Sequence, residues 1–208
     1  MRAWFGVVHG GETRRDNDPR RSLEMARLTT AAWIAHNLGL AASFGGQLFG
    51  KLALNPKLDV LDAKDDRGKM LNAAWNRYNV VNAVSFGVAA LTWFIGRAGI
   101  SGRSIDEDAR NLVLAKDALF VAGALTGLAS IFSGLRLARQ APDGATPIQT
   151  GTEPAPETPE TAAGLLRTVN VLGNVSLLLI AAIIAVTTIL SQKAGQSTRW
   201  SAISRLLP

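Results

Sequence analysis

Four stretches of this chain carry no charged side chain for 18 or more residues, the length that a helix needs to cross a bilayer. They are residues 28–50, 78–96, 118–135 and 168–192. A water-soluble helix of that length would place Lys or Glu on its outer face, and none of these stretches does. The sequence therefore predicts an all-α integral membrane protein, a bundle of four transmembrane helices.

The charged residues divide the 208-residue chain into three parts. We expect a polar, interfacial amino-terminal arm (1–28), a transmembrane domain (29–192) and a basic tail (193–208). The predicted spans are about 29–50, 78–97, 116–136 and 168–191. Four spans leave no room for a separate catalytic domain of ordinary size, about 100–150 residues. In the arm, Trp4 and Phe5 are the predicted interfacial anchors.

All 22 Lys and Arg residues lie outside the four uncharged stretches, so their distribution predicts orientation. Thirteen lie in the arm, the second connection and the tail, and nine lie in the first and third connections. This excess predicts that both termini are cytoplasmic in a multi-pass protein. Because the basic residues are spread out and mixed with 16 acidic ones, we expect the lipid bilayer as partner and no nucleic acid.

A faint internal repeat relates the two halves of the chain. Residues 39–46 (GLAASFGG) match residues 127–134 (GLASIFSG) at five of eight positions. Residues 79–85 (NVVNAVS) match residues 170–176 (NVLGNVS) at four of seven. One hypothesis is a duplicated two-helix hairpin, which gives parallel repeats because two spans return the chain to its starting side. The alternative is chance similarity between spans rich in small apolar residues.

Small residues recur on one face of the first and third spans. They are Gly39, Ser43, Gly46 and Gly50 in the first span, and Gly123, Gly127, Ser130 and Gly134 in the third. Spacings of three and four put each set on one stripe, where another backbone can approach closely. We therefore predict that these residues serve helix packing inside the bundle.

Polar residues within the predicted spans are few. His36 is a candidate proton relay or haem ligand, because an ionisable group at membrane depth suggests function; a neutral interhelical hydrogen bond is the alternative. With Asn82 and Asn174 it forms a candidate polar interior. Asp117 stands beside Lys116 at the start of the third span, which predicts an interfacial ion pair or a helix cap.

The connections between the spans differ in character. The first, residues 51–77, mixes Asp with Lys and Arg in no EF-hand spacing, which predicts a solvated, partly helical loop rather than a metal site. The second contains a capping-box pattern, Ser104-Ile105-Asp106-Glu107, so a helix starting near Ile105 should continue into the third span. The third, residues 140–161, holds five prolines. We predict an extended, mobile linker or, alternatively, a partner-docking strand.

The end of that third connection carries a helix start signal. Thr158 is the predicted cap of the fourth helix, and Pro159 is expected in its first turn, where the missing N–H costs nothing.

The sequence contains none of the usual catalytic or cofactor motifs. With zero Cys and no HExxH, P-loop or Ser-His-Asp arrangement, we expect no enzyme activity, catalytic residue, cofactor or bound metal. The leading hypothesis is a structural or accessory subunit that packs through its small-residue faces against itself or other membrane subunits. The alternative is a small transporter or channel with a polar path between the hairpins. The lack of a carboxylate at mid-membrane disfavours ion coupling.

Overall fold

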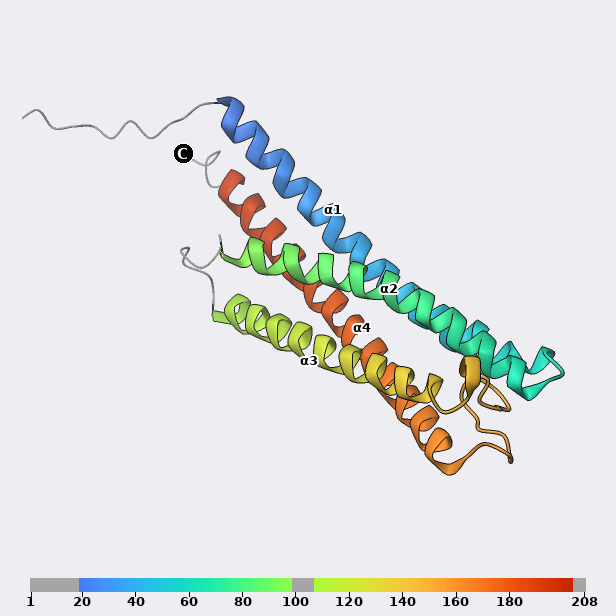
Figure 1. Cartoon of the computed structure of the whole chain (residues 1–208). Coiled ribbons are helices and arrows are strands. Elements are labelled where there is room, and N and C mark those ends of the chain that lie inside the picture. The colour runs from blue at the N-terminus through green and yellow to red at the C-terminus, as the bar shows by residue number, and fades with distance from the viewer. Residues whose placement is uncertain (1–18, 99–106, 204–208) are drawn as a thin grey trace, which may run out of the picture.

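The computed structural model describes residues 19–98 and 107–203, and within them the chain forms four long helices and no β-strand. The helices are α1 (Pro19–Phe49), α2 (Lys64–Ala98), α3 (Glu107–Ala138) and α4 (Glu160–Ile203). They run alternately up and down, so the beginning of α1 and the end of α4 lie at the same end of the bundle (Figure 1). The all-helical prediction is confirmed.

The bundle consists of two helical hairpins. α2 packs mainly against α1, and α4 packs mainly against α3. α1 also contacts α4, whereas α2 and α3 touch each other little. The two hairpins share a buried apolar core of six residues: Leu40, Ala89, Trp93, Phe120, Ile180 and Ile183.

Large apolar side chains cover the outside of the helices. More than half of the surface of each of these residues is exposed: Leu38, Phe49, Val84, Leu91, Leu125, Phe132, Val171 and Leu178. A bundle in water would place charged residues at such positions, whereas lipid solvates apolar side chains without cost. The outer surface therefore fits a membrane protein.

Three of the described helices are long and apolar enough to cross a membrane, judged by length and composition. These segments are Lys64–Arg97 in α2, Asp108–Ala138 in α3 and Glu160–Lys193 in α4. The mean hydropathy of α1 is too low for it to count as a fourth such helix, because its uncharged part contains the strongly polar residues His36, Asn37 and Gln47. Composition thus supports three of the four predicted spans.

The helices extend beyond the predicted spans. α2 begins at Lys64 rather than near residue 78, and α4 continues to Ile203 through most of the predicted tail. Uncharged stretches mark only the part of a helix that lipid surrounds, so charged turns at either end are missed. Trp4, Phe5 and the Ser104–Asp106 part of the predicted cap lie outside the described residues.

The first connection is partly helical, as predicted. α1 passes directly into a π-helical turn, η1 (Gly50–Leu54), which a 3₁₀ helix, η2 (Pro56–Val60), follows. Both lie at the end of the bundle opposite the start of α1 (Figure 1).

The third connection is folded against the bundle, so the prediction of an extended linker is wrong. It contains a short 3₁₀ helix, η3 (Pro142–Gly144), and its side chains Thr146, Ile148 and Ala155 are buried. Ile148 belongs to a second apolar core with Leu58, Leu71, Leu137, Ala162 and Leu166. Its prolines shape turns, and the apolar residues between them supply the packing that a mobile linker lacks.

Hydrogen bonds fix this connection to the first connection and to the start of α2. The backbone N–H of Gly151 donates to the carbonyl of Asn55 at 2.8 Å. The Arg67 side chain, which is buried, donates to the carbonyls of Leu61 at 2.7 Å and Gln149 at 2.9 Å. The Thr158 hydroxyl donates to the Pro147 carbonyl and is not the helix cap that the sequence suggested.

Candidate functional site

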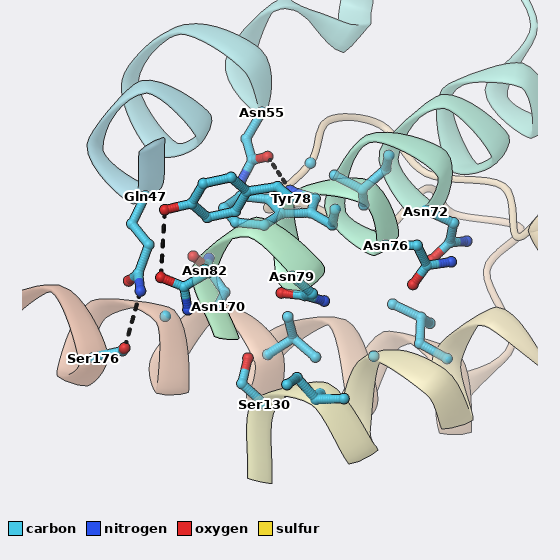
Figure 2. A pocket seen from close by; sticks show the side chains of 18 of the residues that line it. Gln47, Asn55, Asn72, Asn76, Tyr78, Asn79, Asn82, Ser130, Asn170 and Ser176 are labelled. Carbon is cyan, nitrogen blue, oxygen red and sulfur yellow. Dashed lines mark hydrogen bonds between the residues drawn. The ribbon is translucent and has the colours of Figure 1, made fainter. Parts of the chain in front are cut away.

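A cavity of about 100 Å³ lies between the two hairpins, near the end that carries η1 and η2. All four helices contribute to its walls (Figure 2). The polar lining residues are Gln47, Lys51, Asn55, Asn72, Asn76, Tyr78, Asn79, Asn82, Ser130, Asn170 and Ser176. A water needs about 10–15 Å³ of such space, so the cavity has room for several waters or a small polar group.

The amides of α2 face the cavity because of their spacing. Asn72, Asn76, Asn79 and Asn82 follow one another at intervals of three and four residues, which puts them on one side of the helix. Figure 2 shows Asn79 of α2 and Ser130 of α3 pointing into the space between the hairpins from opposite sides.

The hollow itself results from small residues on α3. Gly127 and Gly134 line the cavity beside Ser130, and a Cβ atom added to either glycine would meet nothing within 4 Å. Larger side chains at these two positions would fill the space. Three of the four residues of the predicted third-span stripe therefore border the cavity. The fourth, Gly123, packs closely against the Phe86 ring.

Most polar groups in the walls are held by hydrogen bonds to the protein. Gln47 Nε2 donates to Ser176 Oγ at 3.1 Å, Trp75 Nε1 to Asn55 Oδ1 at 2.9 Å, Tyr78 OH to the Ser43 carbonyl at 2.8 Å, and Asn72 Nδ2 to the Gly144 carbonyl at 2.8 Å. These bonds link α1 to α4 and α2 to both connections. The walls are therefore fixed in place before any ligand enters.

Lys51 is the one charged side chain among the described residues that line the cavity. Its Nζ atom donates to the Oδ1 atom of Asn170 at 3.1 Å, and it makes no ion pair within the described part of the chain. Burial lowers the pKa of the Lys51 amine from its usual value. The cavity thus offers a cation whose nearest acceptor is a neutral amide.

Two cavity amides have no protein partner. Within the described residues, the side chains of Asn76 and Asn79 make no hydrogen bond to another protein group, and neither does the Ser130 hydroxyl. Each amide offers two N–H donors and a carbonyl acceptor. These groups are free to bind water or a ligand.

A second polar cluster surrounds Lys116, nearer the start of α3. Lys116 is 0% exposed and His36 is 2% exposed. His36 Nδ1 lies 2.7 Å from the carbonyl of Ala89, which only accepts, so Nδ1 carries the proton. Nε2 then accepts a hydrogen bond from Lys116 Nζ at 3.1 Å. Lys116 Nζ also lies 3.9 Å from the centre of the Trp93 ring, a cation–π geometry.

Asp117 pairs with Arg97 of α2 and not with Lys116. Its carboxylate forms the ion pair with Arg97 and accepts a hydrogen bond from Trp93 Nε1 at 2.9 Å. Successive side chains of a helix point about 100° apart, so Lys116 enters the interior while its neighbour Asp117 reaches the end of α2.

The structure does not bring the predicted polar interior together. Asn82 lines the cavity, His36 belongs to the Lys116 cluster, and Asn174 is exposed on α4. Asn170 faces the cavity instead of Asn174. In the comparison of residues 79–85 with 170–176, Asn170 aligns with Asn79, which also lines the cavity.

The small residues of α1 meet α2 closely. A Cβ atom on Gly39 would collide with the Ser85 carbonyl, and one on Gly46 would collide with the Tyr78 ring. Gly50 lies against the ring of Trp75 in the same way. Ser43, between them, is fully buried.

No group of three or more His, Cys, Asp or Glu side chains in the described ranges 19–98 and 107–203 is arranged to hold a metal ion. Comparison with protein families, with curated proteins and with solved structures finds no significant match to this chain.

Proposed function

We propose that this chain is a four-span integral membrane protein and that its function is non-catalytic, as a structural or accessory subunit. The observation that carries the proposal is the apolar outer surface of all four helices, α1 included. Leu38 and Phe49 of α1 are exposed, whereas His36 and Gln47 are buried. Most of the polar side chains that lower the hydropathy of α1 therefore face the interior of the bundle, which favours α1 as a fourth span.

Both termini lie on the same side in this proposal, and the Lys and Arg distribution favours the cytoplasm. The arrangement as two hairpins, with the matched residues Asn79 and Asn170 both at the cavity, supports a duplicated hairpin. The two stripes of small residues differ in their contacts, however, so a duplication has diverged in packing.

A continuous polar path is disfavoured by an apolar layer. Along α1, Leu40 and Phe44 lie between His36 and Gln47, and they pack in the central core with Phe86, Phe120 and Ile180. This layer separates the cavity from the Lys116 cluster. A channel or transporter needs the two polar regions to connect, so an accessory or binding role suits the bundle better.

The accessory role is tested by purification from the native membrane in a mild detergent, with mass spectrometry of every co-purifying protein. We expect recovery in a larger complex with a fixed stoichiometry. Recovery of the chain alone, with no stoichiometric partner, would contradict the accessory role and return attention to an autonomous transporter.

Topology is tested separately by cysteine labelling, which is clean because the chain has zero Cys. Single cysteines at Glu24, Ser101 and Glu153 are labelled with a membrane-impermeant maleimide. With four spans, Glu24→Cys and Ser101→Cys react from one side and Glu153→Cys from the other. If α1 does not span, Glu24→Cys reacts from the side of Glu153→Cys.

A further inference from the structure

The cavity between the hairpins has a charge imbalance that points to a class of ligand. Among the described residues, its lining contains one cation, Lys51, and no carboxylate. The closest acceptor to Lys51 Nζ is the neutral amide of Asn170. A half-buried ammonium group is stabilised most by an anion with oxygen acceptors, because charge-assisted hydrogen bonds are the strong ones. A cation would be repelled.

Hydrogen-bond donors without a protein partner line the same cavity as Lys51. Asn79 and Ser130 point into the cavity from opposite hairpins (Figure 2), and neither has a hydrogen-bond partner within the described part of the chain. Asn76 adds a third unpartnered polar group from α2. Amide N–H and hydroxyl groups donate to phosphate oxygens without adding charge.

The position of the cavity along the bundle fits the headgroup level of a bilayer. Lys51 immediately follows the uncharged stretch 28–50 of the first helix, where lipid tails give way to headgroups. Apolar residues such as Ile131 and Val169 also line the cavity. An acyl chain attached to a bound headgroup would pack against such apolar side chains.

We propose that this cavity binds a phosphate-type anion, with Lys51 as the charged contact and Asn79 and Ser130 as neutral donors. The phosphate of an anionic membrane lipid and a free phosphate ion share this chemistry. The site goes beyond a structural or accessory role and does not depend on it, since a bundle of either function holds the same cavity.

The test measures binding by the delipidated full-length protein in an uncharged detergent. Thermal unfolding is followed while phosphatidylglycerol, phosphatidylcholine or inorganic phosphate is added. We expect stabilisation that saturates with phosphatidylglycerol and a much smaller effect of phosphatidylcholine, whose headgroup has no net charge. Equal stabilisation by the two lipids, or no stabilisation by either phosphatidylglycerol or inorganic phosphate, would overturn the proposal.

Inorganic phosphate distinguishes the two sources of the anion. Saturable stabilisation by phosphate alone, together with competition against phosphatidylglycerol, identifies the phosphate group itself as the ligand. Stabilisation by phosphatidylglycerol without an effect of phosphate identifies the lipid. Both results support a phosphate-type anion site.

Two variants connect the effect to the cavity. Lys51→Met should weaken phosphatidylglycerol binding about tenfold or more, the size expected for the loss of one charge-assisted hydrogen bond. Asn79→Leu removes a neutral donor without touching Lys51 and should weaken binding by a smaller factor. Lys57→Met is the matched control, because Lys57 is exposed on η2 outside the cavity lining.

Unchanged affinity in both cavity variants, or an equal loss in Lys57→Met, would overturn the proposal. Melting curves without lipid show whether each variant is folded. If Lys51→Met does not fold, Asn79→Leu still decides whether the cavity is the site.

Discussion

Nζ of Lys116 lies 3.1 Å from Nε2 of His36, and this hydrogen bond connects α3 to α1 across the centre of the bundle. Trp33, Trp93 and Phe120 surround the pair, and Trp93 stands closest to the lysine. A basic side chain fully buried within a candidate membrane span needs such partners, because hydrocarbon offers none.

The hydrogen bond between Lys116 and His36 predicts that substitutions of the two residues have non-additive effects on the stability of the fold. His36→Leu removes the acceptor and leaves Lys116 buried without it, so we expect a loss of about 2–3 kcal/mol of stability. Adding Lys116→Met to that variant replaces the buried polar group by an apolar one of similar length and should restore most of the loss. Thermal or denaturant unfolding in detergent micelles measures the double-mutant cycle.

Trp33→Leu is a useful control for this cycle. Trp33 is partly exposed, and its ring contacts His36 but makes no hydrogen bond to His36 or Lys116. Additive effects of His36→Leu and Lys116→Met, with no rescue in the double variant, would show that the hydrogen bond does not stabilise the bundle.

The sequence could not predict this cluster. A charged residue usually marks the end of a span, so the sequence predicts that Lys116 lies at the membrane edge beside Asp117. Its burial depends on the rings of α1 and α2 around it and on His36, which is 80 residues away in the chain. Tertiary packing determines which side chains contact Lys116, and no local sequence pattern indicates them.

Glycines 39 and 45 of α1 make a matched pair for helix packing. Gly39→Ala places a Cβ atom against the Ser85 carbonyl of α2, whose backbone cannot yield cheaply, so we expect a loss of about 1–3 kcal/mol. Gly45→Ala meets nothing within 4 Å and should be neutral or stabilise by up to about 1 kcal/mol through helix propensity. Unfolding in detergent or in bilayers measures both. Equal effects would mean that α1 does not approach α2 at Gly39.

The small-residue stripe of α1 could be predicted from the sequence, because the spacing of residues alone determines which of them share a helix face. The stripe of α3 follows the same rule, yet Gly127 and Gly134 border a cavity rather than another helix. Spacing shows which residues share a face but not what lies opposite. On α2 likewise, the spacing of the asparagines that line the cavity places them on one face of the helix but does not show the cavity opposite them.

Arg67 holds the third connection in place and gives the next prediction. Its guanidinium group donates to three carbonyls, those of Asp59, Leu61 and Gln149. Arg67→Met leaves these acceptors without their donor, and we expect faster protease cleavage within residues 139–159.

Arg67→Lys should rescue little, because a single ammonium group lacks the planar fork that reaches all three carbonyls. Arg77→Met, an exposed position on α2, is the control. An unchanged cleavage rate in Arg67→Met would show that the apolar core alone fixes the segment.

Lys64 and Glu157 form an exposed ion pair at 2.8 Å between α2 and the third connection, which predicts a response to pH. The hydrogen bond from Lys64 lowers the pKa of the Glu157 carboxyl below its usual 4.5. A carboxyl whose pKa is lowered in the folded state stabilises the fold above its unfolded pKa, and the effect is lost as pH falls through the folded value. Carbon NMR titration of the labelled carboxyl should therefore show a midpoint below 4.5 in the native chain. In Lys64→Gln the midpoint should return toward 4.5, and an unmoved midpoint would show that the pair does not form in solution.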